Sequence, residues 1–279
     1  MPSNYSSDKT LNEAIRALIA GGRYDDAIDR LRFSCKEAEA EYGPWHPKTV
    51  SNKIALTDTL MRSGDLDGAR LHVDVLLSGL MSRNEGESLL SARARARAAD
   101  VAFRQQNYGK ADQLAESAVD GLARHLTDTH PEVLEARVLL GCIRNWTLRH
   151  GEARTILESL VALYDAGTTD GIDILATTWA LVYNAVGERQ FADAERYARR
   201  ALETSIQLYG RRHKATAKAM TVLAMALRES GKDEYALNYA DRAIEIFREN
   251  REENLPSADA AKVLAMTIRG FRAPKEPLA

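Results

Sequence analysis

The chain has little of the chemistry that marks secreted proteins and nucleic-acid binders. Only two cysteines, Cys35 and Cys142, occur among 279 residues, which excludes a disulfide framework and a cysteine-rich metal site. The 38 Lys and Arg nearly balance the 40 Asp and Glu, which argues against a dedicated binder of nucleic acid. No apolar run approaches the roughly 18 residues of a membrane span, and the first residues are polar. We therefore expect a soluble, cytoplasmic protein that binds neither nucleic acid nor membrane.

Recognisable catalytic motifs are also missing. The sequence has no glycine-rich phosphate loop, no His-Glu-x-x-His, no Gly-x-Ser-x-Gly and no histidine–carboxylate cluster with metal-ligand spacing. The nearest candidate combines His125, Asp128 and His130, which fall in a connection between repeats. We predict a non-enzymatic protein with no catalytic residue, no metal and no cofactor.

What the sequence does have is an internal repeat. Six alanines follow one another at intervals of 42, 42, 42, 41 and 42 residues: Ala27, Ala69, Ala111, Ala153, Ala194 and Ala236. They close a corner of the form Gly-x-(Tyr/Leu)-x-x-Ala, which is clearest at residues 22–27 and 64–69 and looser around Tyr108 and Ala111 and around Phe191 and Ala194. A period of this length is typical of a stacked solenoid.

The corner suits the turn of a helical hairpin. A glycine permits the positive φ that ends the first helix, and an alanine lets the second helix approach its neighbour closely. Residues 217–227 and 236–247 place apolar side chains at helical spacing. Each repeat is therefore predicted to form two antiparallel helices.

A second pattern lies 23 residues before three of the alanines. It is His-Pro at His46 and His130, and His-Lys at His213. Proline has a preset φ and needs no amide hydrogen, so it suits the first position of a helix. We interpret these histidines as marking helix starts rather than catalysis.

With these two patterns the chain resembles the tetratricopeptide-repeat family, in the 42-residue form of kinesin light chains. HEAT and armadillo repeats have a similar period, but the corner and the His-Pro entry favour the tetratricopeptide form. The resemblance implies an all-α, right-handed superhelical solenoid of about six 42-residue helix-turn-helix repeats, in a single domain over residues 1–279. The repeats are expected at residues 4–45, 46–87, 88–129, 130–170, 171–212 and 213–254, with a capping helix at 256–272.

The resemblance also implies that the first helix of each hairpin lines a concave groove. Family groove positions, counted from the histidine, together with an unusual arginine run at residues 93–97, give the candidate binding residues Arg16, Asp58, Arg62, Arg93, Arg97, Asp100, Phe103, Arg104, Glu135, Cys142, Trp146, Trp179, Tyr183 and Arg228. The same counting also gives Lys9, Asn12, Ser51, Ile54, Met61, Ala96, Val138, Asn145, Ala176, Val186, Gly187, Lys218, Thr221, Met225 and Glu229.

Two chemical hypotheses follow from this set. Arg93, Arg97 and Arg104 are suited to clamp a carboxylate or phosphate, although arginines between packed alanines also reach simply toward water. Trp146 and Trp179 either line the groove or pack in the core. Trp45, beside the His-Pro entry, is expected to pack in a loop.

Kinesin light chains repeat an Asn-Asn pair in the first helix, whereas this chain has pairs such as Ile54-Ala55 and Val138-Leu139. An amide ladder for a peptide backbone is therefore missing. The leading hypothesis is an adaptor or scaffold that binds a protein or peptide segment of acidic and hydrophobic character. Two alternatives stay open: a small-molecule regulator or pathway enzyme with a pocket in the middle repeats, and a homo-oligomer that associates through helix faces or the end helix.

Overall fold

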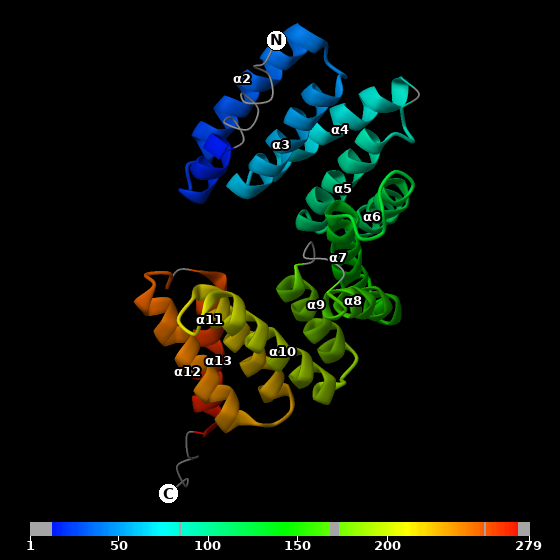
Figure 1. The fold of residues 1–279 in the computed structure, drawn as a ribbon. Helices are drawn as coiled ribbons and strands as arrows, with labels where there is room; N and C mark the ends of the chain where they lie inside the picture. Colours follow the sequence, from blue (N-terminus) through cyan, green and yellow to red (C-terminus); the bar gives the residue numbers. More distant parts are fainter. Residues whose placement is uncertain (1–12, 84, 168–172, 254, 273–279) are drawn as a thin grey trace, which may run out of the picture. The chain divides into compact units, whose positions relative to one another are not determined.

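The computed structural model describes residues 13–83, 85–167, 173–253 and 255–272, and these ranges contain helices and short connections (Figure 1). The expected start of the first repeat, residues 4–12, lies outside them. Residues 13–20 are helical. The helices that follow are α2 (Tyr24–Tyr42), α3 (Pro47–Ser63), α4 (Leu66–Ser82), α5 (Leu89–Arg104), α6 (Tyr108–Ala123), α7 (Pro131–Trp146), α8 (His150–Asp165), α9 (Ile174–Gly187), α10 (Phe191–Tyr209), α11 (Lys214–Glu229), α12 (Asp233–Glu249) and α13 (Pro256–Arg272).

These helices form sequential antiparallel pairs. Residues 13–20 pair with α2, α3 with α4, and so on to α11 with α12, which gives six pairs and a final helix in the described chain. The all-α repeat solenoid predicted from the sequence is confirmed. Contacts divide the chain into two compact units, Met1–Ile143 and Arg144–Ala279, and each is considered separately below.

The repeated alanine occupies one position in every pair. It is the fourth residue of the second helix, as Ala69 is of α4 and Ala236 is of α12. All six alanines are 0% exposed. In a close-packed interior, a larger side chain at such an enclosed position is expected to displace its neighbours. The repeat period is therefore a packing requirement.

The turn between the paired helices has a left-handed residue five positions before each alanine. Three are the predicted glycines, Gly22, Gly64 and Gly231. The other three are Gln106, Leu148 and Arg189, with φ of 62°, 61° and 58°. The sequence corner predicted the turn but not that non-glycine residues adopt positive φ in half of the repeats. Backbone hydrogen bonds hold these turns: Asn107 N–H donates to the Ala102 carbonyl at 2.9 Å.

The histidines before α3, α7 and α11 cap these helices. Nδ1 of His46 accepts the Lys48 backbone N–H at 3.3 Å. His130 and His213 accept the equivalent N–H groups at 3.2 Å. The ring of His46 also stacks on Tyr42, with centroids 4.8 Å apart. These contacts satisfy backbone donors that a helix start leaves unpaired, and they confirm the interpretation as helix starts.

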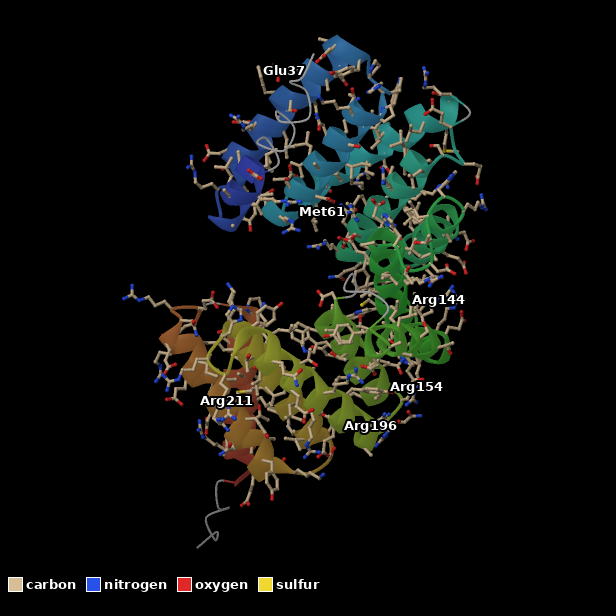
Figure 2. All side chains as sticks on the ribbon, viewed as in Figure 1. Glu37, Met61, Arg144, Arg154, Arg196 and Arg211 are labelled. Atoms are coloured by element: carbon tan, nitrogen blue, oxygen red, sulfur yellow. The ribbon has the colours of Figure 1, made fainter. Side chains whose placement is uncertain are left out.

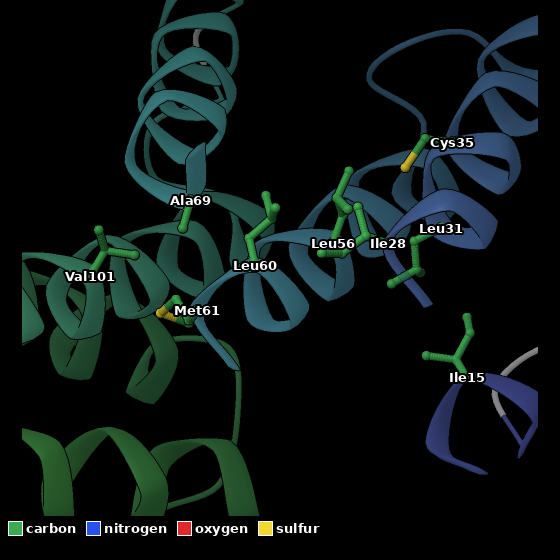
Figure 3. Packing of buried hydrophobic residues seen from close by; sticks show 9 residues of the cluster. All are labelled: Ile15, Ile28, Leu31, Cys35, Leu56, Leu60, Met61, Ala69 and Val101. Atoms are coloured by element: carbon green, nitrogen blue, oxygen red, sulfur yellow. The ribbon is translucent and has the colours of Figure 1, made fainter. Parts of the chain in front are cut away.

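The core of the first unit lies between the paired helices. Figure 3 shows one cluster, in which side chains of the helix at residues 13–20 and of α2, α3, α4 and α5 meet: Ile15, Ile28, Leu31, Cys35, Leu56, Leu60, Met61, Ala69 and Val101. Trp45 packs against a second cluster from the loop before α3, as predicted. Its ring lies where a side chain at Gly79 would stand, since a Cβ there would be 1.7 Å from the ring.

The final helix α13 has the bounds predicted for the capping helix, residues 256–272. It packs on α11 and α12. Its buried side chains are mostly small: Ala258, Ala261, Leu264, Ala265 and Ile268. The helix therefore closes the apolar face of the last pair, as a solenoid end requires.

Candidate functional site

In the first unit, three charged side chains form a row across consecutive first helices. Nε of Arg97 on α5 lies 2.7 Å from Oδ1 of Asp58 on α3. Nη1 of the same guanidinium lies 3.4 Å from Oε1 of Glu135 on α7. One arginine thus bridges carboxylates of the preceding and following repeats. The row brings together three of the residues predicted for the groove.

The other two arginines of the predicted clamp are also paired. Arg93 donates to both carboxylate oxygens of Glu132 at 2.7 and 2.8 Å. Arg104 donates to both oxygens of Asp100 at 2.9 and 3.3 Å. An incoming anion would compete with these bidentate pairs, which are among the stronger charge-assisted contacts. Arg93, Arg97 and Arg104 therefore form ion pairs within the chain. They neither make an open anion clamp nor reach only toward water.

Burial of the Asp58 carboxyl raises its pKa to about 6. The Arg97 guanidinium opposes this rise, and the charge of Glu135 adds to it. The side chains of Arg97 and Asp58 are 24% and 32% exposed. At neutral pH the row holds one shared cation between two carboxylates, so it has little capacity to attract another anion.

The second unit contains an apolar cavity of about 290 Å³ between α9, α11 and α13. Tyr183 and Met225 present 54% and 37% of their surface to solvent there, and burial of part of the ring raises the pKa of the Tyr183 hydroxyl. The lining consists of Val182, Tyr183, Val186, Val222, Met225, Ala226, Arg228, Glu229, Ala260, Val263, Leu264 and Thr267.

Two cations lie along the same stripe of α11 as Met225. Lys218 precedes it by seven residues and Arg228 follows it by three, so the three share a helix face. Within the described chain, neither Lys218 nor Arg228 has an ion-pair partner, and Glu229 is the one carboxylate in the cavity lining. The cavity thus combines apolar walls with an edge that carries one cation, Arg228, and one carboxylate, Glu229, while Lys218 lies on the same face of α11 outside the lining.

Tyr183, Val186, Met225, Arg228 and Glu229 were predicted at groove positions from the sequence, and all five line this cavity. The wall contributed by α13 was not predicted, because this helix was expected to cap the last repeat or to mediate self-association. A signal was present: Leu255-Pro256 stands 42 residues after His213-Lys214. The helix α13 therefore occupies the first-helix position of a further repeat.

The remaining predicted residues are distributed differently. Trp146 is 62% exposed, and Trp179 is half-buried with its indole nitrogen enclosed; neither lines the cavity. Phe103 is half-buried, with its ring centroid 5.9 Å from that of Tyr108. Arg16 and Arg62 are exposed, and Cys142 is half-buried.

Polar contacts between repeats position the cavity helices of the second unit. The Asn184 side chain on α9 donates to Oδ1 of Asn145 at 2.7 Å and to the His150 carbonyl at 2.8 Å. Asn184 is 1% exposed. A buried amide with two acceptors fixes the position of α9 against the preceding pair.

A second contact of this kind joins Asp193 to two arginines that are labelled in Figure 2, Arg154 on α8 and Arg196 on α10. Asp193 accepts from Arg154 at 2.6 Å and from Arg196 at 2.8 Å. These two hydrogen bonds hold the pKa of the Asp193 carboxyl below its usual value. The start of α10 is thereby tied to α8.

The fold and the repeated corner define a helical-repeat protein of the hairpin-solenoid class. Residues 173–249 match the sequence model of the tetratricopeptide repeat. Over this segment the chain is similar to tetratricopeptide repeats, and its structural neighbours include kinesin-light-chain-like proteins. Such repeats are generally protein-interaction modules and are typically non-catalytic. No curated protein matches the sequence.

Several solved structures are similar in fold. A putative kinesin light chain with nearly identical TPR-like repeats from Podosopora anserina has 16% identity and a TM-score of 0.61, covering 74% of this chain and 98% of its own. A signal-transduction ATPase with numerous domains and a tetratricopeptide-repeat sensor, from Pyrococcus horikoshii, has 16% identity and a TM-score of 0.66, covering 94% of this chain and 38% of its own. A tetratricopeptide-repeat protein from Parabacteroides merdae has 13% identity and a TM-score of 0.55, covering 97% and 95%.

No group of three or more His, Cys, Asp or Glu in the described part of the chain is placed to hold a metal ion. None of its helices has the length and apolar character needed to cross a membrane.

Proposed function

We propose that the protein is a non-enzymatic adaptor that binds a segment of another protein through the second unit. The observation that carries this proposal is the apolar cavity between α9, α11 and α13. Ligand pockets usually measure about 300–1,000 Å³, and this one, at about 290 Å³, lies at the lower end. That size suits one or two apolar side chains of a docked segment.

Exposed apolar side chains at the cavity support a docking role. Tyr183, Met225 and Val263 of the lining are 54%, 37% and 63% exposed, and burying such side chains releases about 25 cal/mol per Å² of apolar surface. Aromatic and methionine side chains are common anchors at binding surfaces, because they offer large or adaptable contact area.

The charges at the cavity indicate the chemistry of the segment. Lys218 and Arg228 flank Met225 on α11, and neither is neutralised by a carboxylate within the described residues. A segment with a carboxylate beside its apolar anchor complements this edge, while Glu229 disfavours a second acidic group close to the cavity. The proposed partner is thus a hydrophobic segment with an acidic flank.

The arginines of the first unit have a secondary place in this proposal. Arg93 and Arg104 already hold Glu132 and Asp100 in bidentate pairs. They contribute to binding only where carboxylates of the segment replace these partners. The cavity of the second unit is therefore the principal contact.

The test is selection of peptides from a random display library by the full chain, followed by affinity measurements on the selected peptides. We expect enrichment of peptides with a large apolar residue next to Asp or Glu. Tyr183→Ser should weaken binding about tenfold, equivalent to about 1.4 kcal/mol, and Arg228→Ala should also reduce its salt dependence.

Tyr235→Ser is the matched control, because Tyr235 is an exposed tyrosine (66%) on α12 outside the cavity lining. Peptides that bind the Tyr183→Ser and Tyr235→Ser variants equally well would contradict the assigned cavity. Failure to select any peptide, with capture of a small molecule from cell extract by the wild type alone, would favour the small-molecule alternative.

A further inference from the structure

Within the part of the chain that the structure describes, the final helix α13 presents two exposed apolar side chains on one face. Val263 and Met266 are 63% and 70% exposed. At 3.6 residues per turn they share a narrow stripe with Asp259 and Gly270, on the side opposite the buried Ala261. Because α13 packs on α11 and α12 through its buried face, the stripe borders this contact, with Val263 in the cavity lining and Met266 outside it.

The repeat shows that this face belongs to an inter-helix contact. The residues 42 positions before Val263 and Met266 are Thr221 and Ala224 on α11, and these are 3% and 0% exposed. At the same place in the preceding first helix the side chains are thus enclosed by neighbouring helices. On α13 the equivalent positions hold larger apolar residues and remain open.

We propose that this stripe is the interface of a homodimer in which α13 packs antiparallel on α13 of a second copy. Its sequence is self-complementary about a twofold axis between residues 263 and 266. Val263 then faces Met266 of the partner subunit, and Asp259 lies toward Arg269 of the partner subunit. An interface of this kind is isologous, so each favourable contact occurs twice.

The charges that border the stripe favour a second copy over an unrelated apolar partner. Within one chain, Asp259 pairs with Lys262 at 3.3 Å, and Arg269 pairs with Asp241 of α12 at 2.6 Å. These four side chains are 41–63% exposed, so the isolated pairs contribute little. In the antiparallel dimer, the Asp241–Arg269 pair of one subunit lies beside the Asp259–Lys262 pair of the other. Negative and positive side chains then alternate along the interface.

The dimer proposal depends on α13 alone and not on the proposed segment binding. The two proposed surfaces share one residue. Val263 belongs to both the stripe and the cavity lining. Met266 of the partner subunit, lying against Val263, would stand at the α13 edge of the cavity. Dimer formation and segment binding at the cavity would then compete.

The test is the mass of the full chain in solution, measured by light scattering and sedimentation across a dilution series. We expect the wild type to shift from one chain to two as concentration rises, and Met266→Glu to remain monomeric. Asp259→Arg and Arg269→Asp should each weaken the dimer about tenfold, because each places like charges together twice. The double variant Asp259→Arg/Arg269→Asp should restore dimerisation.

Met81→Glu serves as the control, since Met81 is a similarly exposed methionine (64%) on α4. All of these positions are on the surface, and thermal melts will verify that each variant is folded. A monomer at every concentration, or a dimer that Met266→Glu leaves intact, would overturn the proposed interface. A double variant no better than either single variant would overturn the antiparallel pairing.

Discussion

Asp58 and Arg97 are 39 residues apart in the sequence, and their charged groups are 2.7 Å apart in the structure. The same spacing recurs in other contacts between repeats, including Arg93 with Glu132 and Arg154 with Asp193. A separation of 39 residues is shorter than the 42-residue repeat by about one helical turn. Side chains of neighbouring repeats therefore pair when they are 39 residues apart in the sequence.

The raised pKa of Asp58 predicts a pH dependence of stability. Because the folded chain raises this pKa from 3.8 to about 6, the folded state binds the proton more tightly than the unfolded state does. The contribution of Asp58 to the free energy of unfolding should thus increase as pH falls from 6 to 4, by about 1 kcal/mol after allowance for its partial exposure. Urea unfolding at several pH values will measure it.

Asp58→Asn should remove this dependence. Asp120→Asn, at an exposed position on α6, should leave it in place. A stability profile that is identical in the wild type and the Asp58→Asn variant between pH 4 and 6 would contradict the assigned environment.

Arg97, the one cation of the row, should contribute measurably to the free energy of unfolding. Arg97→Ala leaves Asp58 and Glu135 facing each other without the shared guanidinium, and loss of one partner of a partly buried pair is expected to cost about 2 kcal/mol. Arg62→Ala, at an exposed neighbouring site, should change stability by less than about 0.5 kcal/mol. Chemical denaturation of both variants at neutral pH provides the comparison, and equal effects would rule out the bridging role.

The non-glycine turns offer a stabilising substitution. Gln106 has a φ of 62°, a region that costs a non-glycine residue about 1 kcal/mol. Gln106→Gly should raise the free energy of unfolding by roughly 0.5–1 kcal/mol. The reverse change, Gly64→Ala at φ 91°, should lower it by a similar amount. The midpoint temperatures of thermal unfolding of the two variants must shift in opposite directions for this explanation to hold.

Gly79 should be intolerant of a side chain. A Cβ at this position would lie 1.7 Å from the Trp45 ring, so Gly79→Ala is expected to cost about 1–3 kcal/mol through displacement of the ring. Gly109→Ala makes no contact within 4 Å and should be neutral or slightly stabilising. If collision with the ring is the cause, Trp45→Leu should reduce the penalty of Gly79→Ala in a double-mutant cycle.

The sequence predicted the parts of the fold that depend on local chemistry. Ala69 and its equivalents, the capping histidines and the bounds of α13 all follow from short patterns that one helix end or one close contact requires. The positive φ of Leu148 could not be predicted, because the surrounding helices impose it on a residue that disfavours it. The left-handed turn is kept by the backbone hydrogen bonds around it rather than by the side chain.

The candidate site was predictable only in part. Counting along the first helices placed Tyr183 and Arg228 on one surface, since they depend on the repeat period alone. The pairing of Arg93 with Glu132 was missed because it depends on the offset between repeats, which no single motif contains. The wall formed by Val263 was not predicted, because α13 was expected to cover the end of the solenoid or to mediate self-association, and not to line a cavity.

The six enclosed alanines give the solenoid a mechanical property. Each sets the distance between two helices at a point with no room to spare, so a larger residue there would act as a wedge. Valine at Ala194, at the start of α10, would push this helix from its neighbours and shift α9 with it. The width of the cavity could thus be adjusted from a position outside its lining, by changing the spacing of the helices that carry it.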